Sequence, residues 1–237
     1  MKSKEEIKKE LADQYFGDEA EDYDTNRSKD PRRSEVIEIQ ERITRDFLKN
    51  TGMNNILDVA CGTGRFFKLY SPRDIYGIDI SSAMLQQARK RKGVKKVQVA
   101  DAEKIPFRDN FFDVVITSQF IMHTPFYKRV IKEMTRVVKK NGSVIIDFPN
   151  LYSISYFFTK KRIKRGELRY YNLFKKKEIY QIAKENNLKI AAIRETVVFS
   201  PMFFPKSLIR LSMALNWLLV KIFPSFSYVF YVHFIKK

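Results

Sequence analysis

Strand-like apolar runs alternate with helical patterns along most of this chain, and this alternation limits the fold more than any other feature. The strand-like runs are rich in Val and Ile, as in SVIIDF at 143–148. Such runs are typical of strands that are buried on both faces of a sheet. Strands that alternate with helices at this spacing form βαβ units, whose strands pair in parallel. The sequence therefore predicts an α/β fold with a mostly parallel sheet and helices on both faces.

Apolar spacing and capping residues give the expected boundaries of the elements. Ser81 is a typical N-cap residue, and the Asn141-Gly142 pair is a helix stop signal ahead of the fifth strand. Helices are expected over 34–49, from 64 to 70, over 81–92 and in a segment through 130–140. Strands are expected over 55–60, 75–80, 97–101, 112–120 and 143–148.

The first expected strand leads into a loop that has almost no side chains. In ILDVACGTGR, residues 56–65, Gly62 and Gly64 leave the backbone N–H groups open to a ligand. Ligands bind beyond the carboxyl ends of parallel strands, and the start of the following helix could receive an anionic or strongly polar group. Asp79 ends the next strand about 20 residues later, where a carboxylate can accept both hydroxyls of a ribose. The alternative for Asp79 is a favourable charge at a helix N-terminus, beside Ser81.

The loop lacks one feature of dinucleotide sites. The diphosphate of NAD needs a third glycine where the helix packs closely, in the pattern G-x-G-x-x-G. Phe67 stands where that glycine would fall. A ligand with a ribose but no diphosphate fits this loop better.

Four segments in order resemble the successive motifs of the class I S-adenosylmethionine-dependent methyltransferases. They are ILDVACGTGR, YGIDIS, ADAEKIPFRDNFFDVVITSQFIMH and EMTRVVKKNGSVII. The resemblance implies a Rossmann-like seven-stranded sheet whose last strand is antiparallel, with the two further strands at 188–199 and 227–235. It also implies one domain over 1–237, with a helical lid at 1–50, a cofactor-binding core at 51–150 and substrate caps at 151–175 and 200–225.

The resemblance implies S-adenosyl-L-methionine as the cofactor, and each assignment follows from the position of a residue in the motifs. The residues for its methionine moiety are Asp58, Ala60, Gly62, Gly64, Ser118 and Gln119. Asp79 is assigned to the ribose, and the residues beside the adenine are Ile80, Met84, Asp101 and Ala102. Ala60 stands where the family has the first glycine of its loop, and a small residue is tolerated there.

The opening segment FGDEAEDYDTNR resembles the family's N-terminal lid, with Tyr23 and Arg27 closing over the cofactor. Tyr23 could equally be an ordinary aromatic that packs a helix. Methyl transfer from a sulfonium is an in-line displacement that gains mainly from orientation. His123, just past the fourth strand, is the candidate general base, because an imidazole titrates near neutral pH. The alternative is a histidine that is hydrogen-bonded to neighbouring backbone.

The charge of the chain is strongly positive and unevenly distributed. The formal net charge is +18, and residues 151–190 hold eleven Lys or Arg against three Glu. This cluster suggests an anionic partner such as phosphate, a membrane surface or nucleic acid, while a solvated basic face is the alternative. An apolar-aromatic run, LYSISYFF at 151–158, directly precedes the most basic part of this cluster.

A second apolar segment, 201–224, carries Lys206, Arg210 and Lys221 on a narrow stripe of a helical wheel. It is either a cap helix buried against the core, or an interfacial helix or pocket roof. Together the two segments favour a small, hydrophobic or lipid-like acceptor and an anionic membrane surface as partner. The alternatives are a sugar or other polar metabolite, an RNA such as tRNA held by the 151–190 surface, and a regulator without catalysis.

The chain contains one cysteine, Cys61, and two histidines. One cysteine excludes an intrachain disulfide, and this set of side chains cannot form a metal cluster. The first residues lack the apolar core of a secretory signal, and no stretch of about 18 apolar residues is free of charge. We therefore expect a cytoplasmic location without a metal or a spanning helix, and association with a membrane surface as the remaining option.

Overall fold

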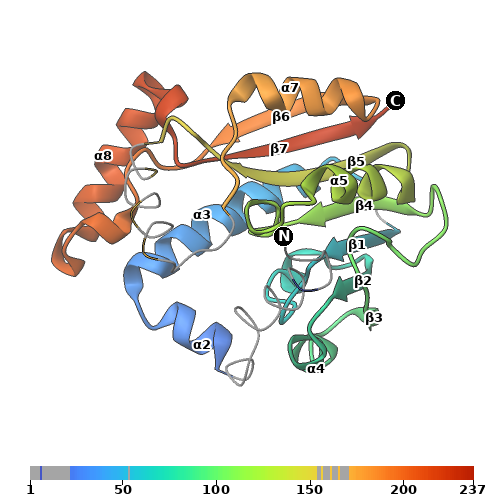
Figure 1. Cartoon of the computed structure of the whole chain (residues 1–237). Coiled ribbons are helices and arrows are strands. Elements are labelled where there is room, and N and C mark those ends of the chain that lie inside the picture. The colour runs from blue at the N-terminus through green and yellow to red at the C-terminus, as the bar shows by residue number, and fades with distance from the viewer. Residues whose placement is uncertain are drawn as a thin grey trace.

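The computed structural model describes residues 22–52, 54–153 and 171–237, together with Glu6, Tyr156, Lys161 and Arg165. In this described part, seven strands form one sheet of order β3-β2-β1-β4-β5-β7-β6 (Figure 1). The strands are β1 Asn55–Val59, β2 Asp74–Asp79, β3 Val94–Val99, β4 Phe112–Thr117, β5 Val138–Pro149, β6 Leu188–Glu195 and β7 Val229–Lys236. β1 to β5 pair in parallel, and β7 runs antiparallel to both β5 and β6. The predicted Rossmann-like sheet with an antiparallel last strand is confirmed.

Helices cover both faces of the sheet, as the strand composition predicts. On one face, α3 (Pro31–Leu48) and α4 (Ser82–Arg89) pack over residues such as Ile145. On the other face, α5 (Tyr127–Val137) and α7 (Lys176–Glu185) pack over residues such as Val144 and Ile146. Successive side chains of a strand point to opposite faces, so each buried strand contributes to two separate apolar layers.

Two further helices, α2 (Tyr23–Ser28) and α8 (Ile209–Ile222), lie outside these layers. α2 precedes α3. α8 follows β6 and projects beyond one end of the sheet (Figure 1). In the part of the chain that the structure describes, no side chain of α2 and only three of α8 are buried.

Helix starts follow the expected capping chemistry. Asp30 caps α3 by accepting a hydrogen bond from the Arg32 N–H at 3.0 Å, and Pro31 occupies the first turn. Ser81 caps α4 as predicted, because its hydroxyl accepts from the Met84 N–H at 3.3 Å. α3 therefore begins before the predicted residue 34, where proline fits the first helical turn.

Two predictions about local structure are wrong. α5 ends at Val137, and β5 begins at Val138 and runs through Asn141-Gly142, so this pair does not stop a helix. Asn141 has a φ of +61° and lies near a register shift between β4 and β5, which is typical of a bulge within a strand.

The α-helix expected over 64–70 is a series of turns and a short 3₁₀ helix, η1 (Phe67–Leu69). Gly64 has a φ of +68°, and Pro72 follows within two turns. A proline disfavours the helical conformation in the residue before it, so the stretch between Gly64 and Pro72 is too short for an α-helix. The loop after β1 therefore offers backbone N–H groups without an α-helix N-terminus.

Candidate active site

The carboxyl ends of β1 to β5 meet at one edge of the sheet, because these strands are parallel neighbours. This edge brings together most of the residues that the sequence singles out for a ligand. The chain positions that meet there are Asp58 and the 60–64 loop after β1, Asp79 at the end of β2, Asp101-Ala102 after β3, and Ser118-Gln119 after β4. The structure thus places side chains from four crossovers around one site.

The loop after β1 takes an unusual backbone path. Ala60, Gly62 and Gly64 all have positive φ, at 58°, 54° and 68°. A Cβ added at Gly62 would meet nothing within 4 Å, so the backbone there faces open space. A Cβ at Gly64 would lie 2.8 Å from the Phe67 ring, so Gly64 is needed for packing under the loop. Gly62 is the point where a ligand can approach the backbone closely.

Asp79 holds this loop to the end of β2. Its Oδ2 accepts from the Gly62 N–H at 2.8 Å, and its Oδ1 accepts from the Ser81 N–H at 2.9 Å. Burial raises the pKa of Asp79, and backbone hydrogen bonds from Ser81, Gly62 and Ile80 oppose that rise. The contact with Ser81 is the one expected of a helix N-terminal charge. A carboxylate has about four lone-pair sites, so ribose hydroxyls could still be accepted.

Asp58 lies in the buried layer under the loop. Its Oδ2 accepts a hydrogen bond from the Tyr70 hydroxyl at 2.7 Å. Burial raises the pKa of Asp58 to about 7, against the lowering effect of the Tyr70 hydrogen bond. Phe67 is fully buried in the same layer and packs 5.9 Å from the Tyr70 ring. The bulky residue of the loop therefore packs into the core and does not fill the space above Gly62.

Helix α2 is attached across the same edge by polar contacts at two points. Asp24 accepts the Thr63 hydroxyl at 2.9 Å and forms an ion pair with Arg91. Arg27 donates to the Gln119 Oε1 at 2.7 Å and to the Tyr23 hydroxyl at 2.6 Å. Tyr23, which is half-buried, thus contacts a residue that reaches the end of β4. The described part of the segment expected to be a lid, from residue 22 on, contacts the loop after β1 and Gln119 after β4, and residues 1–5 and 7–21 lie outside the described residues.

A second group of polar residues at the site is not evident from the sequence. Gln119 has a φ of +58°, and its N–H donates to both oxygens of Asp147, at 2.9 and 3.0 Å. Its side-chain amide donates to the Gln40 Oε1 at 2.9 Å. Burial raises the pKa of Asp147 to about 7. The available signal was an aspartate within the otherwise apolar run SVIIDF, which marks a polar group on a buried strand.

Two guanidinium groups at the site keep unused donors. The Nε of Arg27 and the Nη1 of Arg65 are buried and have no hydrogen-bond partner in the part of the chain that the structure describes. Burial lowers the pKa of Arg65, and the nearby charge of Arg27 lowers it further. A buried donor without a partner costs about 1–3 kcal/mol, and more when it is charged. An anionic group such as the methionine carboxylate of S-adenosylmethionine is a suitable partner for donors of this kind, so these residues fit that cofactor.

The expected adenine side has an apolar rim. Ile80 is 42% exposed beyond β2, whereas Met84 is completely buried in α4. Asp101 and Ala102 are half-buried, and Asp101 accepts from the Glu103 N–H at 2.9 Å. The exposed Ile80 is available to an aromatic ring, whereas the completely buried Met84 is not.

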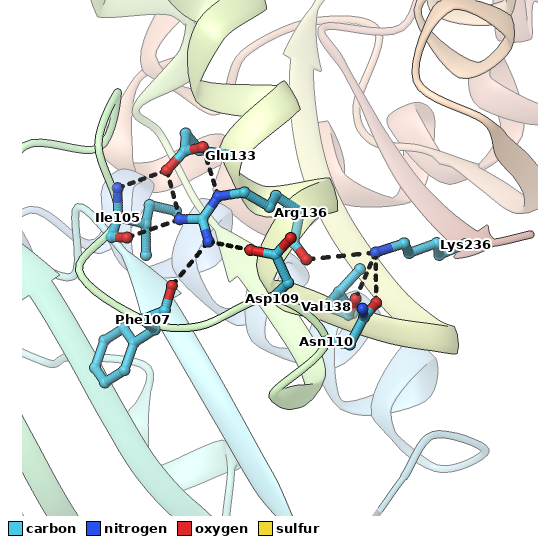
Figure 2. A network of polar contacts seen from close by, with 8 residues as sticks. All are labelled: Ile105, Phe107, Asp109, Asn110, Glu133, Arg136, Val138 and Lys236. Atoms are coloured by element: carbon cyan, nitrogen blue, oxygen red, sulfur yellow. Dashed lines mark hydrogen bonds and ion pairs between the residues drawn. The ribbon is translucent and has the colours of Figure 1, made fainter.

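The loop that carries Asp101 and Ala102 is anchored to α5 by Arg136 (Figure 2). The Arg136 guanidinium donates to the carbonyl oxygens of Ile105 at 2.8 Å and Phe107 at 2.9 Å. It also pairs with Glu133 and Asp109, each at 2.7 Å. This arginine belongs to the motif EMTRVV, and its contacts fix the position of the loop beside the site.

His123 lies at the end of the short helix η2 (Ile121–His123), just past β4. Its N–H donates to the Phe120 carbonyl at 2.8 Å, and its half-buried ring packs edge-on against Tyr171 with a centroid distance of 5.5 Å. Asn172 holds the segment by donating to the carbonyl oxygens of Ile121 and Thr124. The histidine is therefore held in a defined position on the carboxyl side of the sheet.

Some segments that the sequence singles out lie partly outside the described residues. More than half of the cap expected at 151–175 falls outside the described residues, and so do four of the eleven Lys and Arg residues of the basic cluster. Among the residues that are described, no His, Cys, Asp and Glu side chains are grouped as metal ligands would be. Nor does that part of the chain contain a helix with the length and apolar content needed to cross a bilayer.

A family model described as "Methyltransferase domain" matches residues 57–146. The malonyl-[acyl-carrier protein] O-methyltransferase of Legionella pneumophila is 39% identical over 97 residues, which are 38% of this chain and 34% of that protein. The phosphatidylethanolamine N-methyltransferase of Cereibacter sphaeroides is 36% identical over 104 residues, 41% of this chain and 51% of that protein. The chain therefore spans about a third to a half of the length of these two relatives.

Two further comparisons extend over more of the chain. An uncharacterised protein of Methanocaldococcus jannaschii is 30% identical over 142 residues, 60% of this chain and 67% of that protein. The solved structure of a SAM-dependent methyltransferase from Thermotoga maritima superimposes with a TM-score of 0.69 at 19% identity. It covers 96% of this chain and 99% of that one, and it shows a shared fold.

Proposed function

Since the chain belongs to the class I S-adenosylmethionine-dependent methyltransferases, we propose that it transfers the methyl group of this cofactor to a small, hydrophobic or lipid-like acceptor by in-line displacement. The observation that carries the proposal is the edge where β1, β2 and β4 end. That edge carries the open backbone at Gly62, the carboxylate of Asp79, and donors of Arg27 and Arg65 that have no partner among the described residues. The bound cofactor supplies an electrophilic methyl group on its sulfonium.

We assign the cofactor contacts from this geometry. The 60–64 loop would hold the methionine moiety, and Arg27 and Arg65 would bind its carboxylate. Asp79 would accept the ribose hydroxyls, and the adenine would lie between Ile80 and the Asp101-Ala102 turn. Ser118 and Gln119 would lie beneath the methionine chain. α2 would close the site, since Asp24 and Arg27 already attach it to both sides of the edge.

His123 is proposed as the general base where the acceptor must lose a proton. It follows β4 on the carboxyl side of the sheet, and Tyr171 packs against one edge of its ring. Replacement by Ala or Asn should reduce turnover by more than about tenfold while cofactor binding stays normal. A smaller loss would leave His123 with a structural role only.

An apolar acceptor is supported by the surface near α8 and by one relative. Large apolar side chains are exposed from Phe203 to Phe226. The name of the Cereibacter relative refers to a phospholipid. A lipid-like acceptor would be met at a membrane, and the net charge of +18 favours an anionic one. The alternatives are a polar metabolite, and an RNA held by the basic 151–190 surface.

Calorimetry with S-adenosylhomocysteine tests the cofactor site. Asp79→Asn should weaken binding by about tenfold to a hundredfold, because hydrogen bonds to a charged acceptor are lost. The matched control is Asp74→Asn on the same strand, whose side chain is 56% exposed and lies at the opposite end of β2. Failure of the wild-type protein to bind would reject the proposal. Transfer of a labelled methyl group to a panel of amphiphilic and polar acceptors, with unmodified tRNA included, then identifies the acceptor class.

A further inference from the structure

Helix α8 has an orientation that is the reverse of a normal surface helix. A surface helix usually turns its apolar side chains toward the core and its polar ones toward water. In α8 the buried residues are Ile209, Ser212 and Asn216, of which two are polar. Leu211, at 66% exposure, and its apolar neighbours on the next turns face solvent instead.

Hydrogen bonds of one polar side chain fasten the inward face of α8. The Asn216 Oδ1 accepts from the N–H groups of Val198 at 3.0 Å and Phe199 at 2.8 Å. Its side-chain amide donates to the Phe199 carbonyl at 2.9 Å. The Ser212 hydroxyl donates to the Ile209 carbonyl at 2.7 Å. The outward exposure of the leucines is therefore fixed by specific polar contacts.

The exposed apolar side chains form a continuous stripe. Leu211, Leu215, Leu218 and Ile222 follow the spacing i, i+4, i+7 and i+11, which places them on one line of the helix. Their exposed fractions are 66%, 41%, 48% and 55%. We call these four residues the outward face of α8. Other exposed apolar residues of this segment are Phe203, Leu208, Trp217, Phe223 and Phe226.

Cations border this outward face. Arg210, Trp217 and Lys221 form a neighbouring stripe, and the Lys221 Nζ lies 3.4 Å from the centre of the Trp217 ring. Lys206 lies one turn before the helix. The sequence contains no Asp or Glu after Glu195, so no acidic side chain in this segment balances these charges.

We propose that the outward face of α8 docks onto the surface of an anionic lipid bilayer. The leucines and Ile222 insert among the upper acyl chains, while Arg210, Lys221 and Lys206 contact the headgroups. Tryptophan favours this depth, because its ring is apolar and its N–H can reach water. With 14 residues α8 is about 21 Å long, so it lies along the surface and does not cross it.

A second copy of the chain fits this surface poorly. A two-fold interface places the same patch of both copies against each other. Here it would bring Arg210 and Lys221 near their own equivalents, without an acidic residue in the segment to pair with them. Anionic headgroups supply the missing charge. The docking deepens the proposed function by naming its membrane partner, and it rests on that function only for the identity of the acceptor.

The test uses the single tryptophan of the chain, Trp217, as a reporter. Emission is recorded with vesicles of phosphatidylcholine and with vesicles of phosphatidylcholine and phosphatidylglycerol in equal parts, and binding is measured by co-sedimentation. We expect a blue shift, quenching by brominated acyl chains and co-sedimentation with the mixed vesicles, and weaker effects with phosphatidylcholine alone. Absence of binding to the mixed vesicles would overturn the proposal.

Leu211→Ser/Leu218→Ser should reduce the vesicle partition coefficient by about a hundredfold, since each leucine contributes roughly a tenfold factor. The matched control, Tyr180→Ser, removes a 55% exposed aromatic residue from α7 and should bind vesicles like the wild type. Far-UV circular dichroism and calorimetry with S-adenosylhomocysteine show that the variants are folded and keep the cofactor site. Vesicle binding by the double variant as strong as that of the wild type would contradict membrane docking. So would ultracentrifugation in which the wild type is a dimer and the double variant is a monomer. Failed cofactor binding by the wild type would instead refute the proposed function.

Discussion

Arg65 lies half-buried beside Arg27, and each guanidinium retains a buried N–H group without a partner among the described residues. Two like charges in such a position disfavour each other. The apo protein keeps them at a cost in stability, which an anionic ligand would remove. Arg65 therefore lowers the stability of the free protein and raises its affinity for an anionic ligand.

Arg65→Met should therefore stabilise the apo protein by about 1 kcal/mol, because it removes a half-buried guanidinium with one N–H group that lacks a partner among the described residues, and replaces it with an apolar side chain of similar length. The same change should weaken S-adenosylhomocysteine binding by about tenfold, through loss of a charge-assisted hydrogen bond. Urea unfolding and calorimetry measure the two effects. Arg45→Met, at an exposed position of α3, is the control and should change neither. Unaltered affinity in Arg65→Met would show that this side chain does not hold the ligand.

Asp147 gives a prediction about pH. Burial raises its pKa from 3.8 to about 7, so the folded state binds a proton more tightly than the unfolded chain does. The resulting stability is fully present below about pH 4 and is lost as the pH rises through about 7. Wild-type stability should therefore fall between about pH 5 and about pH 8, and Asp147→Asn should reduce that fall by roughly 1–3 kcal/mol.

Urea unfolding at the two pH values measures this difference. Part of the slope should remain in the variant, since burial also raises the pKa of Asp58 to about 7. Asp74→Asn, on an exposed part of β2, should keep the wild-type slope. If Asp147→Asn also kept the full slope, the buried carboxyl would not titrate in this range.

The sequence predicts the site residues that follow strand ends, since Gly62, Asp79 and Gln119 all mark such ends. It does not predict that Gln119 bonds to Gln40 and Asp147, which come from a helix and a strand far apart in the chain. Their proximity depends on how α3 packs over the edge of the sheet, and local patterns contain no information about that packing.

At the scale of elements, the loop between β3 and β4 depends on one side chain of α5. Arg136 bonds to two of its carbonyl groups and to Glu133 and Asp109 (Figure 2). The Glu133 Oε2 also accepts from the Ile105 N–H at 2.8 Å. The helix thereby fixes the backbone that leads from Asp101 and Ala102 into β4.

Arg136→Ala should lower the free energy of unfolding by about 2–3 kcal/mol, because a bidentate ion pair and two carbonyl partners are lost together. It should also increase amide hydrogen exchange in the loop and weaken S-adenosylhomocysteine binding severalfold. The control is Lys132→Ala at an exposed position of the same helix, which should change the free energy of unfolding by less than about 0.5 kcal/mol. Equal losses in both variants would mean that Arg136 does not anchor the loop.

Sequence patterns predict the existence of most elements but not their ends. Ser81 caps the start of α4, as its side-chain chemistry predicts. Asn141-Gly142 has the composition of a helix stop but forms a bulge in β5, because pairing with β4 extends the strand back to Val138. That pairing is a tertiary contact. In the same way, Pro72 decides the length of η1 more strongly than the apolar spacing before it.

At the scale of the whole molecule, the charge excess has two competing interpretations. The chain has 45 Lys and Arg against 27 Asp and Glu, and such an excess attracts any polyanion at low salt. Binding to nucleic acid through phosphates alone weakens steeply as salt rises. Binding by the outward face of α8 also includes apolar insertion, which salt does not screen.

A salt series should separate the two partners. Affinity for unmodified tRNA, measured by fluorescence anisotropy, should fall to a negligible level at about 0.15 M salt. Co-sedimentation with vesicles that contain phosphatidylglycerol should persist at the same ionic strength. The Leu211→Ser/Leu218→Ser variant is the control, since its remaining vesicle binding should become as salt-sensitive as that of tRNA. Tight tRNA binding at physiological salt would favour the RNA alternative.

The position of β7 in the sheet has a consequence for biosynthesis. β7 is made after β6, yet it lies between β5 and β6 and pairs with both. A nascent chain that has reached Glu195 therefore cannot attach β6 to its growing sheet, and the free edge of β5 stays open. Open strand edges recruit other chains and chaperones. The ribosome must deliver Val229–Lys236 before the sheet can close, so ribosome stalling within the preceding α8 would leave an aggregation-prone intermediate.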